Sequence, residues 1–347
     1  MRVREKRRSA VVGAAVAVWV AATAAVLAAT ALAGGGNGVT NGDEGHQHYT
    51  IGLFGDVPYG PAGRAQYPNL IADMNGTKLA FSIFDGDLKN GSERCDNSLY
   101  TTSRDLFNTF AAPVVVLPGD NDWTDCHRAN NGAYDPIERL AFERSIFYTS
   151  DQSLGATTLT VARQPSYPEN VRWRLGPVVY IGLNVQGSND NFPHAGVDGE
   201  ARPASEIARE DAEHLAREAA NVQWLRDGFD YAKSVDAKGV LVAWQGDPNF
   251  NNEQKLQPAS YDGYTAIVDA LRAQTLAFSG QVVLVHGDSH YFKLDKPLNS
   301  PSGRVLANFS RLETFGSANT HWVAADVDAN DPNVFTFRPM IVPQNAG

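Results

Sequence analysis

Residues 51–59 read Ile-Gly-Leu-Phe-Gly-Asp-Val-Pro-Tyr, a short apolar run that ends in a glycine and an acid. The run has the length and composition of a buried strand. In open α/β sheets, ligands bind outside the carboxyl ends of the strands. Four strand-end acids of this kind, each beside a glycine, predict one oxygen-rich metal site rather than four unrelated turns. The four segments are Phe-Gly-Asp56-Val-Pro-Tyr59, Phe-Asp-Gly-Asp87-Leu-Lys-Asn90, Leu-Pro-Gly-Asp120-Asn-Asp122 and Val-His286-Gly-Asp288-Ser-His290.

The first 33 residues have the layout of a secretory signal. Five of the seven residues at positions 2–8 are basic, residues 10–31 are almost wholly apolar, and Ala31-Leu-Ala33 forms a small-x-small cleavage pattern. We predict cleavage after Ala33 and export from the cell. The apolar stretch is long enough to span a bilayer, so an uncleaved N-terminal anchor is the alternative and the only expected attachment to a membrane. Residues 34–48 are rich in Gly, Asn and His and predict a flexible leader, followed by one domain over residues 49–347.

The charge and the cysteines narrow the class of protein further. Removal of residues 1–33 takes away five basic residues and one acidic residue, which changes the formal net charge from −10 to −14. An acidic chain without a basic run argues against a nucleic-acid-binding surface. Two cysteines occur, Cys95 and Cys126. In an exported protein an isolated pair predicts a disulfide, which would tie the loop after Asp87 to the loop after Asp120.

Strands and helices alternate from Tyr49 onward, as in a parallel sheet with βαβ connections. A hairpin is expected around Gly176-Pro177, and apolar and polar residues alternate after Arg304 as in antiparallel strands. These patterns predict one α/β domain of two mixed sheets with outer helices. The expected helices are 64–75, 98–110, 135–147, 205–234 (capped by Ser205) and 262–278, and the expected strands are 51–54, 79–84, 113–117, 173–175, 178–183, 240–244 and 281–285.

The order and spacing of these motifs resemble the calcineurin-like metallophosphoesterase superfamily. Its signatures run Asp-x-His, Gly-Asp-x-x, Gly-Asn-His-Asp/Glu, a strand-end His, and Gly-His-x-His, and the resemblance covers residues 49–310. It implies a four-layer αββα sandwich whose strand-end loops hold two metal ions. It also implies hydrolysis of phosphate esters by a metal-activated hydroxide.

The sequence departs from the family motifs where the family uses histidine. Pro58 stands at the first histidine, Asn121 at the histidine of the third motif, and Gln245 at the strand-end histidine. A one-residue offset in the third motif would make Asn121, rather than Asp120, the ligand. The resemblance implies a metal-binding set of Asp56, Asp87, Asp120 (or Asn121), Gln245, Asp288 (or His286) and His290, with the Tyr59 phenol as a further candidate.

Pro58 cannot bind a metal, but Gln245 and Asp288, which stands at the first histidine of the last motif, replace imidazole nitrogen by oxygen donors. Carboxylate and amide oxygens suit Mg²⁺, Ca²⁺ and Mn²⁺ better than Zn²⁺. We therefore expect two divalent ions, with Mn, Mg or Ca favoured over Zn and with Fe as a further option.

The family's proton-donating histidine is replaced by Asn121, which donates a hydrogen bond but no proton. Our first candidate for the missing acid is His127, oriented by Asp122 or Asp125, and the second is His286. Lys89 and Arg128 are candidate phosphate contacts.

Taken together, these features predict an exported metal-dependent phosphoesterase acting on a phosphorylated small molecule or ester. The alternative is a catalytically weak or inactive protein of the same fold that binds a metal or a phosphorylated ligand.

Overall fold

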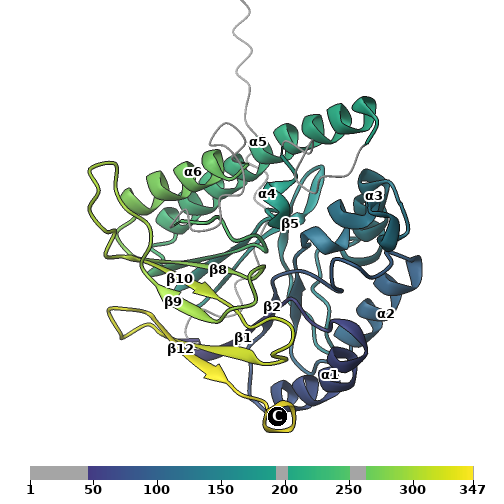
Figure 1. Cartoon of the computed structure of the whole chain (residues 1–347). Helices are drawn as coiled ribbons and strands as arrows, with labels where there is room; N and C mark the ends of the chain where they lie inside the picture. Colours follow the sequence, from purple (N-terminus) through teal and green to yellow (C-terminus); the bar gives the residue numbers. More distant parts are fainter. Residues whose placement is uncertain (1–45, 193–201, 251–262, 347) are drawn as a thin grey trace, which may run out of the picture. The chain divides into compact units, whose positions relative to one another are not determined.

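Two β-sheets form the middle of the fold, and helices lie on both sides of them (Figure 1). The computed structural model describes residues 46–192, 202–250 and 263–346, all within one compact unit, Asn37–Gly347. The expected signal, residues 1–33, and most of the expected leader, residues 34–45, lie outside the described residues.

The first sheet has five strands in the order β12-β11-β1-β2-β3, and the second has seven in the order β4-β5-β6-β7-β8-β10-β9. In the first sheet, β1, β2 and β3 run parallel, and β11 runs antiparallel to both of its neighbours, β1 and β12. In the second, β6, β7, β8 and β10 run parallel. The strands are β1 (His48–Phe54), β2 (Ser82–Phe84), β3 (Val114–Val116), β4 (Ala162–Gln164), β5 (Tyr167–Leu175), β6 (Val178–Gly182), β7 (Gly239–Ala243), β8 (Gln281–His286), β9 (Lys293–Asp295), β10 (Phe309–Glu313), β11 (Trp322–Asp328) and β12 (Phe335–Met340).

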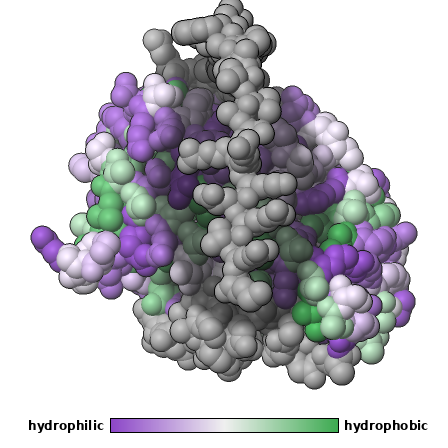
Figure 2. Space-filling view, turned by 90° about the horizontal axis from the view of Figure 1, so that it is seen from above, coloured by the Kyte–Doolittle hydropathy of each residue, from purple (hydrophilic) through white to green (hydrophobic). Residues whose placement is uncertain are grey.

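The helices cover the outer faces of the two sheets. α1, α2 and α3 pack against the first sheet, and α5 and α6 against the second. Seen from the side of α5 and α6, hydrophobic residues form small groups among hydrophilic ones (Figure 2). None of the described helices combines the length and apolar character needed to cross a membrane. The α-helices are α1 (Gly60–Asn75), α2 (Asn97–Phe107), α3 (Pro136–Phe147), α4 (Gly187–Asp190), α5 (Ala204–Ser234) and α6 (Thr265–Leu276), and the short 3₁₀ turns are η1 (Asp120–Asp122), η2 (Thr124–His127), η3 (Ala129–Asn131) and η5 (Pro343–Asn345).

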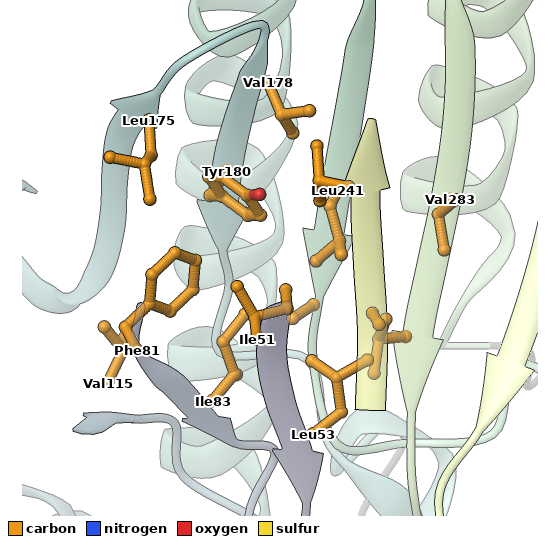
Figure 3. Close-up of a cluster of buried hydrophobic side chains, with 14 of the residues drawn as sticks. Ile51, Leu53, Phe81, Ile83, Val115, Leu175, Val178, Tyr180, Leu241 and Val283 are labelled. Carbon is orange, nitrogen blue, oxygen red and sulfur yellow. The ribbon is translucent and has the colours of Figure 1, made fainter. Parts of the chain in front are cut away.

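The main hydrophobic core lies between the sheets. Side chains alternate along each strand, so that Ile51 and Leu53 of β1 face the second sheet while Phe54 faces the helices. Figure 3 shows the inner layer: Ile51, Leu53, Phe81, Ile83 and Val115 from the first sheet lie opposite Leu175, Val178, Tyr180, Leu241 and Val283 from the second. The strands are apolar on both faces, as expected for sheets covered on both sides.

This arrangement confirms the predicted α/β fold class, a four-layer αββα sandwich of two mixed sheets. Several boundaries were wrong. β1 begins at His48, inside the expected leader, because His48 pairs with Asp328 of β11. Helix α5 begins at Ala204 after Pro203, so Ser205 is not its cap. After Arg304 we expected antiparallel strands, but β10 pairs parallel with β8, because the chain returns to the second sheet by a crossover.

Cys95 and Cys126 form the predicted disulfide, with 31 residues of sequence separation. Both cysteines are fully buried. The bridge joins the segment after Asp87 to the segment after Asp120, so it fixes two strand-end loops relative to each other.

We expect the double substitution Cys95→Ser/Cys126→Ser to lower the free energy of unfolding by about 3–4 kcal/mol, because the reduced chain gains the loop-closure entropy of a loop of this length. Urea unfolding of the oxidised, reduced and double-substituted proteins measures this. A loss below about 1 kcal/mol in both the reduced and the substituted protein would contradict a stabilising role for the bridge.

Candidate functional site

The four predicted strand-end acids lie on loops at the carboxyl ends of parallel strands. Asp56 follows β1, Asp87 follows β2 and Asp120 follows β3, all in the first sheet, while Asp288 follows β8 in the second. The side chains of Asp56, Asp87 and Asp120 are buried, and that of Asp288 is partly exposed. The site therefore lies where the ends of the two sheets meet.

Asp87 is the most heavily bonded of these acids. The Tyr59 hydroxyl donates to Asp87 Oδ2 over 2.7 Å, and the Asn121 amide Nδ2 donates to the same oxygen over 2.6 Å. The backbone N–H of Asn121 donates to Asp87 Oδ1 over 3.0 Å. Both oxygens of Asp87 are thus held by the loops that follow β1 and β3.

Asp56 connects the two sheets. Its Oδ2 accepts a hydrogen bond from the backbone N–H of Asp288 over 3.1 Å, and its Oδ1 lies 3.4 Å from His290 Nε2. His290 Nδ1 lies 2.8 Å from the Ser317 carbonyl oxygen, which orients the imidazole so that Nε2 faces Asp56. The retained histidine of the last motif is therefore next to the acid of the first.

Asp120 and Asp288 approach each other around Gly187. A Cβ placed on Gly187 would lie 2.6 Å from Asp288 Oδ1 and 2.8 Å from Asp120 Oδ2, so the space between these carboxylates admits only glycine. The N–H of Gly187 donates to Gln245 Oε1 over 2.5 Å. Ser188 Oγ donates to Asp120 Oδ2 over 2.6 Å. Gln245 is thus beside the same glycine as the two acids.

The backbone at the site is unusual. Asp56, Asp87, Asp288 and His290 all have positive φ, at 51°, 69°, 78° and 63°. Asp and His tolerate this left-handed region better than most residues, but it remains unfavourable. Clusters of such residues persist where the surrounding structure holds them, typically at functional sites.

Burial and mutual repulsion govern the electrostatics. Burial is the main cause of the raised pKa of Asp87, and the charges of Asp120 and Asp56 raise it further. Burial likewise raises the pKa of Asp288, with Asp120 as the next cause. Burial alone would lower the pKa of His290, but the hydrogen bond and charge of Asp56 outweigh it and raise that pKa to about 9. The site is short of positive charge.

Because of this shortage of positive charge, we predict that in the presence of a chelator the free energy of unfolding falls as the pH rises from 6.5 to 9. His290 binds its proton more tightly when folded than when unfolded across this whole window, and Glu313, whose pKa burial raises to about 7, does so only at its lower end. The folded state then holds more protons, so the free energy of unfolding falls by about 1.4 kcal/mol per pH unit for each excess proton. The buried His286, with its pKa lowered to about 4, acts in the opposite sense only below this window.

Chemical unfolding at pH 6.5, 7.5 and 8.5 in a chelator measures this slope. We expect His290→Gln to reduce this slope by up to about 1.4 kcal/mol per pH unit, the contribution of one excess proton, because the substituted side chain does not titrate. A stability that stays constant or rises over this range would show that these groups are not proton-binding in the folded state.

The donor types at the site fit a hard divalent cation, since carboxylate and amide oxygens predominate and the charges of Asp120 and Asp56 raise the pKa of Asp87 and Asp288. In the structure, however, these carboxylates are engaged in hydrogen bonds with neighbouring residues. Within residues 46–192, 202–250 and 263–346, no three or more His, Cys, Asp or Glu side chains are arranged so that they could hold one metal ion. Asp87 and Asp120 instead accept hydrogen bonds from Tyr59, Asn121 and Ser188.

The candidate phosphate contacts lie in different surroundings. Lys89 is fully buried, and its Nζ donates to the carbonyl of Asn90 and to Asn131 Oδ1. Burial lowers its pKa. This position does not favour the predicted contact with a phosphate group. Arg128 is partly exposed and forms an ion pair with Asp125, with 2.5 Å between Nη1 and Oδ2.

The two candidate acids also differ in position. His127 is partly exposed on η2, and its Nδ1 lies 2.7 Å from the Thr124 carbonyl. Asp122, one of its two suggested orienting partners, instead accepts hydrogen bonds from the backbone N–H groups of Asp87, Leu88 and Gly119. His286 is fully buried, and its Nε2 has no hydrogen-bond partner among the residues that the structure describes.

Sequence reasoning missed two acids next to the site. Asp85, in the same Phe-Asp-Gly-Asp segment as Asp87, is buried and accepts from Thr314 Oγ1 over 2.8 Å. It follows an apolar run and precedes a glycine, which is the signal used for the other four acids. Glu313 ends β10 and accepts from Ser289 Oγ and from the N–H of Tyr291, but it follows Ser310 and Arg311 and carries no such signal. Ser188 lies in the polar loop 187–191, a candidate lining of the substrate pocket from its residue types, and the structure brings it to Asp120.

Comparisons with known proteins give distant structural similarity alone. No protein-family pattern and no curated protein matches the sequence. Among solved structures, the chain is similar to the 5'-nucleotidase of Candida albicans (TM-score 0.44, 11% identity, 86% of this chain and 52% of that chain) and to purple acid phosphatase PPD1 of yellow lupin (TM-score 0.43, 10% identity, 84% and 53%). It is also similar to GAP50 of Plasmodium, the anchor in the inner membrane complex (TM-score 0.41, 10% identity, 85% and 89%).

The chain spans about half the length of the nucleotidase and of the purple acid phosphatase. At these TM-scores and identities the similarity carries no conclusion about activity. What the site can do has to be argued from its own residues.

Proposed function

We propose that this protein is an exported, metal-dependent phosphoesterase that acts on a phosphorylated small molecule or ester. One observation carries the proposal: acids from four strand ends on two sheets lie so close together that the charges of Asp120 and Asp56 raise the pKa of both Asp87 and Asp288. Such a cluster of carboxylates is stabilised by cations. The Cys95–Cys126 disulfide suits the oxidising environment that export would provide.

In this proposal Asp87 lies between two cation positions, because it is near Asp56 on one side and Asp120 on the other. Asp56 and His290 would hold one cation, and Asp120 and Asp288 with Gln245 would hold the other. Bound divalent cations would supply the positive charge that stabilises phosphoryl oxygens and lowers the pKa of a water molecule.

The chain's own groups orient the candidate ligands. Tyr59 and Asn121 donate to Asp87 and so fix both of its oxygens. The Ser317 carbonyl fixes the ring of His290. Asn121 has an amide N–H that can stabilise charge on a phosphoryl oxygen, but a proton for the leaving group must come from another residue. His127 remains our candidate for that donor.

A second candidate function is a non-catalytic protein of this fold that binds a cation or a phosphorylated ligand. The observation that favours it is the closed hydrogen bonding of Asp87 with Tyr59 and Asn121. Asn121 stands where the resembled family has a proton-donating histidine and cannot supply a proton, which also favours a non-catalytic protein.

One set of measurements separates the two functions. The purified protein is treated with a chelator and then assayed on aryl phosphate monoesters and diesters with Mn²⁺, Mg²⁺, Ca²⁺ or Zn²⁺, while bound metal is determined by elemental analysis. Phosphoesterase function predicts turnover that the chelator removes and Mn²⁺, Mg²⁺ or Ca²⁺ restores. Stoichiometric cation binding without turnover of either ester would support the binding protein, and absence of both would exclude the phosphoesterase and the cation-binding form of the second function.

A further inference from the structure

The segment that follows β6 has a backbone that is rare in proteins. Ser188, Asn189, Asp190 and Asn191 are four consecutive non-glycine residues with positive φ, between 52° and 59°. L-residues visit this left-handed region singly, and runs of them are strongly disfavoured. A left-handed turn of this length therefore needs support from its surroundings. Figure 1 shows it as the short α4 element beside α5.

The turn contacts the candidate site through Ser188 and through Gly187, the residue before it. Ser188 Oγ donates to Asp120 Oδ2 over 2.6 Å and lies 3.5 Å from Asp125 Oδ1. Gly187 fills the space between Asp120 and Asp288. The conformation of the turn therefore sets the position of the hydroxyl against one oxygen of Asp120.

A buried arginine of α5 holds the other end of the turn. Arg217 is fully buried, and its Nη1 donates to Asp190 Oδ1 over 2.5 Å while its Nη2 donates to the Asp190 carbonyl over 3.0 Å. His214 Nδ1 lies 2.8 Å from the same carbonyl. The guanidinium also lies over the ring of Trp123, at 5.5 Å, directly after the segment that carries Asp120. One arginine thus contacts both segments that meet at the Ser188–Asp120 hydrogen bond.

We propose that Ser188 is a further positioning residue of the site: Arg217 holds it through Asp190, and its hydroxyl donates to Oδ2 of Asp120 and so fixes the orientation in which that carboxylate meets a bound cation. The inference rests on the cation site of the proposed function and adds to it the group that orients Asp120. Outer partners of this kind orient carboxylate ligands, and their loss typically weakens metal binding 10–100-fold.

The test separates the hydroxyl from the backbone. Ser188→Ala and Ser188→Gly both remove the hydroxyl, but only glycine relieves the left-handed backbone. We expect both variants to bind Mn²⁺ about 10–100-fold more weakly in isothermal titration calorimetry, and only Ser188→Gly to melt at a higher temperature in a chelator. Ser166 is the matched control, because it is an exposed serine with φ of 68° in the turn between β4 and β5. The same two substitutions there should leave Mn²⁺ affinity unchanged.

Three outcomes would overturn the inference. Wild-type Mn²⁺ affinity in both Ser188 variants would show that the hydroxyl does not orient Asp120. Weak binding in the alanine variant with normal binding in the glycine variant would assign the effect to the backbone. If the wild-type protein binds no Mn²⁺, Mg²⁺ or Ca²⁺, the cation site of the proposed function fails, and this inference fails with it.

Arg217→Lys keeps the positive charge but removes the planar guanidinium that donates two hydrogen bonds to Asp190. We expect this variant also to bind Mn²⁺ more weakly than the wild type.

Discussion

Asp87→Asn is expected to lower kcat/KM for an aryl phosphate by on the order of 10³-fold. The substitution removes the carboxylate that the proposed function places between the two cation positions. Each tenfold loss corresponds to about 1.4 kcal/mol of transition-state stabilisation. Asparagine has nearly the same shape but carries no charge, and its amide would face the Asn121 amide that now donates to Asp87 Oδ2. The variant should therefore bind cations weakly as well as turn over slowly.

The matched control is Asp105→Asn, because Asp105 is an exposed acid paired only with its neighbour Arg104. It should retain full turnover and cation binding. Melting of Asp87→Asn in a chelator should not fall far below that of the wild type, since the substitution removes one of several mutually repelling charges. Turnover within tenfold of the wild type, at saturating Mn²⁺, would show that the strand-end acids are not the reacting site.

The strand-end acids could be identified from the sequence because each is defined by six or seven consecutive residues. An apolar run, a glycine and an acid give both the strand and the residue at its end, and parallel strands bring such ends to one edge. Asp56 and Asp288 show this over the longest range, since 232 residues separate the carboxylate of one from the backbone N–H that it accepts from the other. The cysteine pair was predictable for a similar reason, namely that the number of possible partners was one.

The supporting residues could not be identified in this way, since tertiary contacts decide their positions. Lys89 lies two residues after Asp87 and looked like a phosphate contact, but its ammonium donates to Asn131, 42 residues further along the chain. Ser188 donates to Asp120, which lies 68 residues earlier in the chain, and Arg217 of α5 donates to Asp190 in the same left-handed turn. No local pattern records either contact.

Gly119 provides a second test with a large expected effect, because it forms the close approach of the β3 loop to Asp87. A Cβ on Gly119 would lie 2.0 Å from Asp87 Oδ1 and 2.6 Å from the backbone nitrogen of Asp87. The backbone nitrogen cannot rotate away as a side chain could. The φ of Gly119 is −114°, which any residue adopts, so Gly119→Ala changes the packing without straining the backbone.

We expect Gly119→Ala to lower the free energy of unfolding by about 1–3 kcal/mol through overpacking and to lower turnover by at least 10²-fold, because a shift of about 1 Å in a reacting group has an effect of that size. Gly76→Ala is the control: Gly76 has φ of −74°, and its added Cβ would meet neighbours at 3.4 Å. Urea unfolding and turnover of both variants give the comparison. If Gly119→Ala matched the wild type in both, the loop after β3 would have room to move away from Asp87, and the fixed geometry on which the candidate site depends would be wrong.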